Sequence, residues 1–221
     1  MTGAILDRLD PGPEDVVMDL GCGTGLYARG LSGRASVVVC ADPSPAMLAQ
    51  LPADERLIPL HADAEDLADG RITSPHAGYD AILLKEVLHH VADPPDVIAG
   101  LVRLLRPGGR ILVVMLPTTI DYPLFEAALR LFRERQPDPD GIAAAMDHSG
   151  LRTELTYEEF PLAFTVEHYS RMVRDRYMSL LSSFDDTEIE AGISEIRRNY
   201  PGPELRFPDR FALVLGTKET A

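Results

Sequence analysis

A glycine-rich segment that follows a carboxylate carries the strongest chemical signal in the chain. The pattern D-x-G-x-G-x-G is formed by Asp19, Gly21, Gly23 and Gly25, with Cys22 inside it. Glycines let a backbone turn tightly and bring its N–H groups close to a bound ligand. The dinucleotide-binding pattern requires glycine or alanine at the position of Leu26, so it matches poorly. A ligand-binding loop is therefore predicted, and a glycine-rich turn without a ligand is the alternative.

A second carboxylate, Asp42, ends the next apolar run in the stretch ADPSPAML, residues 41–48. A carboxylate in this place can accept hydrogen bonds from both hydroxyls of a ribose, which suits an adenosine without a 2′-phosphate. Pro43 and Met47 would then supply apolar surface for the adenine. The alternative is that Asp42 only caps the helix that begins near Ser44.

A third carboxylate, Asp63, follows another apolar run in the stretch HADAEDL, residues 61–67. There it can accept a hydrogen bond from the amino group of an adenine, while the backbone N–H of Ala64 faces a ring nitrogen. Aspartates in loops also form turns without any ligand, so the alternative for Asp63 is a turn-forming role.

These residues need a scaffold that brings several strand ends together. Short apolar runs with little alternation are typical of parallel strands buried on both faces. They predict strands at 16–20, 36–42, 56–63, 79–84 and 109–116 and helices at 27–31, 46–50, 65–68 and 94–105. Strand–helix repetition of this kind predicts an open α/β sheet. Further on, helices are expected at 123–136, 141–148, 166–183 and 187–199, and strands at 152–164 and 211–218.

Together these motifs resemble the class I S-adenosylmethionine-dependent methyltransferases, in particular their small-molecule branch. The resemblance spans Asp15 to Met115 and a C-terminal strand pair. It implies a Rossmann-like, doubly wound sheet of seven strands, mostly parallel, whose antiparallel last strand is the stretch FALVLGTK. It implies that Gly21–Gly25 hold the methionine part of the cofactor S-adenosylmethionine, Asp42 the ribose and Asp63 the adenine. We expect one domain over 1–221, with a core at 15–116, helical insertions at about 120–148 and 166–200, and a final strand at 211–218.

The stretch YDAILLKEVLHHVADP, residues 79–94, resembles the fourth-strand motif of the same family, where the strand end meets the sulfonium. Relatives often carry a neutral residue where this chain has Lys85 and Glu86. The Lys85 backbone is expected to touch the methionine moiety, and the Glu86 side chain to add negative charge there or hold a substrate amine. One of His89 and His90 is expected to accept a proton from the methyl acceptor. The alternatives are a solvated Lys–Glu pair and structural histidines.

The helical insertion near the C-terminus is where this family usually builds its acceptor specificity. Arg171 or Arg176 is expected to hold a substrate carboxylate, and Tyr177 to donate or accept a proton. The alternative is that these basic residues pair with the abundant acidic residues on a solvated face.

The overall composition indicates which classes of binding partner are disfavoured. The chain of 221 residues has 21 Lys and Arg against 35 Asp and Glu, which gives a net charge of −14. An acidic surface disfavours nucleic acids and anionic lipids. The two cysteines, Cys22 and Cys40, form no metal-binding or disulfide pattern. We therefore expect no metal, a small-molecule substrate, a cytoplasmic location, and a monomer or homodimer.

Three functions fit these residues. The first is methyl transfer from S-adenosylmethionine to an N, O or C atom of a small molecule by in-line displacement, in specialised, natural-product biosynthesis. The second is a cyclase or lyase on the same fold that converts the cofactor itself to a small-ring amino acid and methylthioadenosine, with Glu86, the histidine pair and Tyr177 acting on its aminobutyryl group. The third is a non-catalytic cofactor-binding partner subunit, against which the intact glycine and acidic motifs argue.

Overall fold

The computed structural model describes residues 1–220, which group into two compact units. The first unit comprises residues 1–115 and 137–156 and the C-terminal segment from Ala212 onward. The second unit comprises residues 116–136 and 157–211. No helix within residues 1–220 is both long and apolar enough to cross a membrane. The prediction of one domain with helical insertions stays a prediction.

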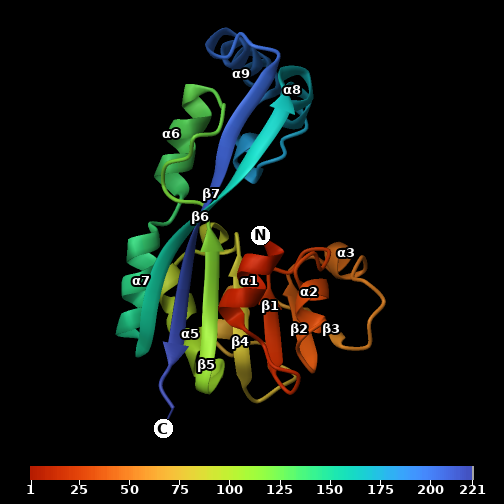
Figure 1. Cartoon of the computed structure of the whole chain (residues 1–221), viewed down its shortest axis with the longest axis vertical. Helices are drawn as coiled ribbons and strands as arrows, with labels where there is room; N and C mark the ends of the chain where they lie inside the picture. The colour runs from red at the N-terminus through yellow and green to blue at the C-terminus, as the bar shows by residue number, and fades with distance from the viewer. Residues whose placement is uncertain (221) are drawn as a thin grey trace. The chain divides into compact units, whose positions relative to one another are not determined.

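A seven-stranded sheet has the strand order β3-β2-β1-β4-β5-β7-β6 (Figure 1). Its strands are β1 (Val16–Leu20), β2 (Val37–Asp42), β3 (Leu57–His61), β4 (Tyr79–Lys85), β5 (Leu105–Met115), β6 (Leu151–Thr165) and β7 (Glu204–Lys218). The pairs among β1 to β5 are parallel, and β7 runs antiparallel to β5. The predicted fold class is confirmed. Because the order reverses between β2 and β4, the carboxyl end of β1 lies at the point where such sheets bind ligands.

Helices cover the sheet of the first unit on both faces. They are α1 (Thr2–Leu9), α2 (Ala28–Ser32), α3 (Pro45–Leu48), α4 (Ala64–Ala68), α5 (Pro94–Leu104) and α7 (Pro139–His148). The helix α5 packs between α4 and α7, and this layer buries the main apolar core. The helices α1 and α2 contact each other and pack on β5 and β2. All five residues of β1 are buried, which explains the apolar runs without alternation.

The second unit consists of three helices, a 3-10 helix and parts of two strands. Its elements are α6 (Glu126–Arg135), α8 (Val166–Arg174), η2 (Ser179–Ser183), α9 (Asp186–Asn199) and the segments of β6 and β7 within 157–211. A methyl group added at Gly192 would lie 2.3 Å from Cδ1 of Phe125. Glycine at this position of α9 therefore lets the Phe125 ring pack directly against the helix backbone.

Three elements differ from the sequence expectation. The structure has a helix before the first strand, α1, for which the sequence analysis predicts no element; Ile5 and Leu9 are its fully buried residues. The helical stretch expected at 166–183 is interrupted, because Arg176 adopts a left-handed backbone with φ of 55° after α8 ends. The last strand begins at Glu204 rather than at Phe211, so it is longer than the stretch FALVLGTK.

Candidate functional site

The glycine loop leaves the carboxyl end of β1 with a backbone that side chains rarely permit. Gly21, Gly23 and Gly25 have φ angles of 72°, 55° and 82°. A methyl group at Gly21 would lie 2.4 Å from Cγ2 of Val87, whereas one at Gly23 would meet no atom within 4 Å. Gly21 is therefore required by both its packing and its backbone angle, and Gly23 by its backbone angle alone. The open space over Gly23 is where a ligand can approach the backbone.

The Asp42 carboxylate at the end of β2 is held in place by the backbone of two loops. Its Oδ2 accepts a hydrogen bond from the N–H of Gly23 at 2.9 Å, and its Oδ1 accepts one from the N–H of Ser44 at 2.9 Å. Each carboxylate oxygen can accept more than one hydrogen bond, so the group retains capacity for two hydroxyls. The side chain that caps α3 belongs to Ser44, which accepts from the N–H of Met47. The N-cap of α3 is therefore Ser44, and Asp42 bonds the backbone N–H of that residue; the ribose role of Asp42 stays a prediction.

The loop after β2 has one further contact that the sequence did not reveal. His61 is the register partner of Asp42 on β3, and its Nε2 lies 3.0 Å from the carbonyl oxygen of Pro43. This contact fixes the loop that follows Asp42. Pro43 and Met47 are both exposed, so their apolar surface is accessible to a ligand. Their predicted role beside an adenine stays a prediction.

Asp63 stands directly before α4 and acts as its N-cap. Its side chain accepts a hydrogen bond from the N–H of Asp66 at 2.7 Å, and Ala64 begins the helix. Asp63 therefore has a local structural role, because it caps the first turn of α4. The carboxylate has capacity for a further hydrogen bond. The predicted contact of Asp63 and Ala64 with an adenine stays a prediction.

Asp19 is the interior carboxylate of this region. Asp19 is only 2% exposed, and its carboxylate oxygen Oδ2 has no hydrogen-bond partner. The pKa of Asp19 is raised to about 7. Burial is the largest cause; the hydrogen bond from the N–H of Ala28 lowers the pKa, and the charge of Asp42 raises it. Cys22 is also buried, and its Sγ donates to the carbonyl oxygen of Gly23 at 3.6 Å. Buried acceptors without a hydrogen-bond partner are uncommon in folded proteins, so Oδ2 of Asp19 retains capacity for one more hydrogen bond.

The end of β4 turns sharply beside the glycine loop. The Lys85 ammonium lies over the ring of Tyr27 at 5.8 Å, a cation–π contact. Glu86 has a left-handed backbone with φ of 55°, and its N–H donates to the carbonyl oxygen of Val114 at 2.9 Å. Such a backbone is uncommon outside glycine and clusters at functional sites. It also turns the chain so that Val87 can pack on Gly21.

The two histidines after β4 lie in a 3-10 helix, η1 (Leu88–His90). Their ring centroids are 3.9 Å apart, with His89 half-buried and His90 exposed. Burial, then the neighbouring His90 and Lys85, lower the pKa of His89 to about 4. The His89 imidazole is therefore neutral near neutral pH, and it is a weaker base than an ordinary histidine. The N–H of Ala92, just past the pair, donates to Oε1 of Glu65 at 2.9 Å and anchors this segment.

The residues predicted to face an acceptor lie in the second unit. Tyr177 is 36% exposed, but its hydroxyl lies 2.8 Å from that of Tyr169, and burial of this hydroxyl raises the pKa of Tyr177 to about 12. Arg171 is exposed. Arg176 donates to Oδ1 of Asp186 at 2.8 Å and to the carbonyl oxygen of Phe184 at 3.1 Å. Arg176 therefore has a structural role at the start of α9, and the substrate roles of Arg171, Arg176 and Tyr177 stay predictions.

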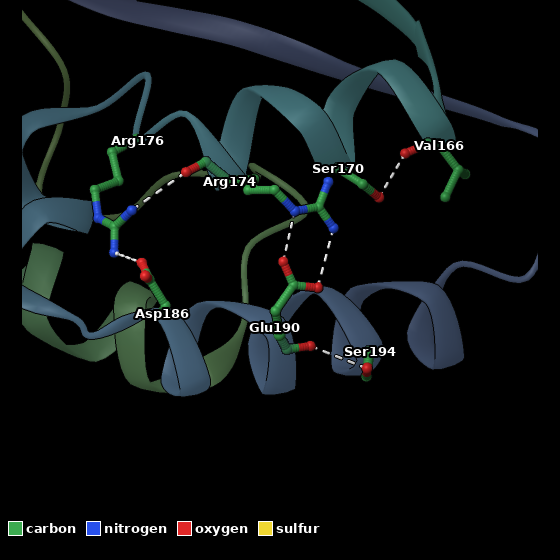
Figure 2. Close-up of polar contacts among 7 residues, drawn as sticks. All are labelled: Val166, Ser170, Arg174, Arg176, Asp186, Glu190 and Ser194. Atoms are coloured by element: carbon green, nitrogen blue, oxygen red, sulfur yellow. Dashed lines mark hydrogen bonds and ion pairs between the residues drawn. The ribbon is translucent and has the colours of Figure 1, made fainter.

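Figure 2 shows how α8 and α9 are joined at this place. The Arg174 guanidinium faces the Glu190 carboxylate, with Nε to Oε1 at 2.5 Å and a second bond to Oε2 at 3.0 Å. Arg176 follows with its bond to Asp186 at the start of α9. Within residues 1–220, no group of three or more His, Cys, Asp or Glu side chains is arranged to hold a metal ion.

The family comparison places a methyltransferase domain over residues 18–113. Over 115 residues, 52% of this chain, the sequence is 31% identical to an uncharacterized methyltransferase of Mycobacterium bovis. Over 151 residues, 62% of this chain, it is 30% identical to the ubiquinone biosynthesis O-methyltransferase of Xylella fastidiosa. The chain matches 57% and 61% of the length of these two relatives.

A solved structure shows the same fold over the whole chain. The YcgJ protein of Bacillus subtilis superposes with a TM-score of 0.71, covering 100% of this chain and 98% of that protein at 18% identity. The likeness therefore extends beyond residues 18–113 to the elements that follow β5.

Proposed function

The chain belongs to the class I S-adenosylmethionine-dependent methyltransferase family, and we propose that it is an enzyme that transfers a methyl group from S-adenosylmethionine to a small molecule. The observation that carries this proposal is the glycine loop held by Asp42. Its Oδ2 binds the N–H of Gly23 at 2.9 Å, beside the open space over that glycine.

The residues present fit the cofactor in chemical type. Asp42 offers a buried carboxylate, 8% exposed, for the ribose hydroxyls. Pro43 and Met47 offer exposed apolar surface for the adenine, and Asp63 a carboxylate for its amino group. Asp19 offers an unpartnered oxygen for a hydrogen-bond donor at the methionine end. The backbone of Gly21–Gly25 and the backbone at Lys85 complete the proposed set of cofactor-binding groups.

When bound, S-adenosylmethionine supplies a methyl group on a sulfonium, which a nucleophile displaces in line. The protein's part is then to orient the two reactants, exclude water and accept a proton from the acceptor. We assign the proton-accepting role to His89 rather than His90, because His89 is half-buried whereas His90 is exposed; its pKa of about 4 keeps the imidazole neutral but makes it a weak base. The exposed His90 contacts it and helps to keep that pKa low.

The acceptor is proposed to be a small molecule of a biosynthetic pathway, including specialised metabolism. Support comes from the similarity to an O-methyltransferase of ubiquinone biosynthesis, which makes a hydroxyl oxygen the first acceptor atom to test. The carboxylate of Glu86, a residue with a left-handed backbone directly after β4, would instead favour an acceptor amine. A panel of small phenols, carboxylic acids and amines therefore covers the chemistry that the site offers.

The experiment is product analysis of the purified chain by mass spectrometry. With S-adenosylmethionine and the acceptor panel, we expect S-adenosylhomocysteine and a product heavier by one methylene unit. Asp42→Ala serves as the binding-deficient control, and Asp96→Asn, which removes an exposed carboxylate on α5, as the matched control. Methylthioadenosine formed without any acceptor would instead identify a cyclase or lyase. Tight cofactor binding with no product from any acceptor would favour a non-catalytic partner.

A further inference from the structure

Asp19 occupies a position that is unfavourable for a charged group. It is 2% exposed, and its register partners on the neighbouring strands are Cys40 of β2 and Leu83 of β4. A buried carboxylate is stable as an ion only when hydrogen bonds or a cation compensate for the lost water. The surroundings of Asp19 supply little of either.

The hydrogen bonding of Asp19 is incomplete. The backbone N–H of Ala28, the first residue of α2, donates to the carboxylate, but Oδ2 has no partner. The titratable groups that face it are Asp42 and Cys40 on β2 and Cys22 on the glycine loop. None of these three can carry a positive charge, and an ionised Asp42 repels a second carboxylate.

The physical consequence is a proton held near neutral pH. Burial, followed by the charge of Asp42, raises the pKa of Asp19 to about 7, well above the ordinary value of 3.8. Near neutral pH the carboxyl group is therefore a mixture of both protonation states. A donor or cation that arrives at Oδ2 would shift this equilibrium toward the carboxylate.

The ligand proposed for this site carries such a donor. S-adenosylmethionine has an α-ammonium group with N–H bonds and a sulfonium without any. At the methionine end of the molecule, the ammonium is the group that can donate the hydrogen bond that Oδ2 lacks, while its charge also compensates for that of Asp42. The glycine loop that begins two residues after Asp19 is the segment expected to hold this end of the molecule.

We propose that cofactor binding is coupled to the release of one proton from Asp19, whose unpartnered Oδ2 accepts a hydrogen bond from the cofactor's ammonium. This inference rests on the proposed function. The balance is simple: the O–H bond of the Asp19 carboxylic acid breaks, its proton passes to solvent, and the carboxylate binds the ammonium. No other bond forms or breaks.

The coupling sets the pH dependence of affinity. Below pH about 7 the free protein carries the proton and must lose it on binding, so the dissociation constant rises about tenfold for each unit of pH decrease. Above that pH the free carboxyl group is already ionised, so affinity becomes independent of this group. The midpoint of this change reports the pKa of Asp19 in the free protein.

The test is isothermal titration calorimetry of the full chain with S-adenosylhomocysteine, which keeps the ammonium but has no sulfonium. Measurements in buffers of different ionisation enthalpy give the number of protons released. We expect close to one proton at pH about 6 and close to none at pH about 8.5. Methylthioadenosine, which lacks the ammonium, should bind without proton release at either pH.

The variant Asp19→Asn keeps an acceptor for the N–H of Ala28 but cannot titrate. It should abolish the proton release, whereas the exposed Asp96→Asn should leave it unchanged. If Asp19→Asn does not fold, the wild-type buffer series alone decides the matter, since it needs no variant. Binding of S-adenosylhomocysteine without proton release at pH about 6 would overturn the inference. Absence of binding at every pH would instead overturn the cofactor assignment on which it rests.

Discussion

The Oδ2 atom of Asp42 lies 2.9 Å from the backbone nitrogen of Gly23, so a carboxylate on β2 fixes the glycine loop that follows β1. The same carboxylate holds the N–H of Ser44 through its other oxygen at 2.9 Å. One side chain thus sets the geometry of two loops at the carboxyl edge of the sheet. A substitution of Asp42 therefore affects both the shape of the glycine loop and the proposed ribose contact.

Replacing Asp42 should weaken cofactor binding strongly. Asp42→Ala removes the acceptor for Gly23 and Ser44 as well as the proposed acceptor for the ribose. Hydrogen bonds to a charged group contribute about 1.5–3 kcal/mol each, so we expect the dissociation constant for S-adenosylhomocysteine to rise at least about tenfold. Calorimetry measures it directly. An unchanged dissociation constant would refute the ribose assignment.

Two glycines of the loop should respond differently to the same substitution. Gly21→Ala places a methyl group 2.4 Å from Val87 and also strains a left-handed backbone, so we expect it to lower the free energy of unfolding by about 2–5 kcal/mol. Gly23→Ala meets no atom within 4 Å, and its left-handed backbone alone costs about 1–2 kcal/mol. Gly23→Ala should nevertheless weaken cofactor binding in calorimetry, because its methyl group would enter the ligand space. Full affinity in a folded Gly23→Ala protein would place the ligand elsewhere.

The buried carboxyl group of Asp19 should make stability depend on pH. Because its folded pKa of about 7 exceeds the ordinary value of 3.8, its stabilising contribution is complete below pH 3.8 and is lost as the pH rises through about 7. Asp19→Asn should therefore gain stability over the wild type as the pH rises from about 4 to 8, by at most about 4 kcal/mol. Urea unfolding of both ligand-free proteins across this range measures the difference. A difference that does not grow with pH would show that Asp19 is ionised throughout.

His89 should not produce a titration near neutral pH. Its pKa of about 4 means that it is neutral across the range in which an unperturbed histidine gains its proton. Turnover at saturating cofactor should therefore show no His89-dependent loss down to pH about 5. His89→Gln should lower kcat over the whole range, with little change in cofactor affinity. An unaltered kcat would remove His89 from the proton-accepting role.

Tyr177 is expected to act on turnover rather than on cofactor binding. Tyr177→Phe removes the hydroxyl that lies 2.8 Å from the Tyr169 hydroxyl but keeps the ring. We expect kcat to fall while the dissociation constant of S-adenosylhomocysteine stays within about twofold of the wild type. Tyr169→Phe is the matched control, since it breaks the same hydrogen bond from the buried side. Equal effects of the two variants would indicate a structural role for the pair.

The sheet and its ligand loop could be predicted because their signals are local. Glycine spacing, apolar runs and the carboxylates Asp42 and Asp63 lie within short stretches of sequence. Contacts between distant segments could not be predicted in this way. The partner of Arg176 is Asp186, and the contact of His61 is Pro43, each formed only when separate elements pack.

Backbone conformation is the second feature that could not be predicted from the sequence. A left-handed angle at Glu86, which lets Val87 pack on Gly21, runs against the preference of a glutamate and is not visible in the sequence. The same holds for Arg176, where the left-handed residue interrupts the helix expected over 166–183. The orphan oxygen of Asp19 is likewise a property of the folded interior, since the sequence pattern shows only that an acidic residue precedes the glycines.

The most direct measurement is a crystal structure of the chain grown with S-adenosylhomocysteine. We expect density for the nucleoside in the space over Gly23, both ribose hydroxyls on the Asp42 carboxylate, and the amino group on Oδ2 of Asp19. A vacant space at saturating ligand, or the same space occupied in solution by a nicotinamide dinucleotide, would contradict this expectation.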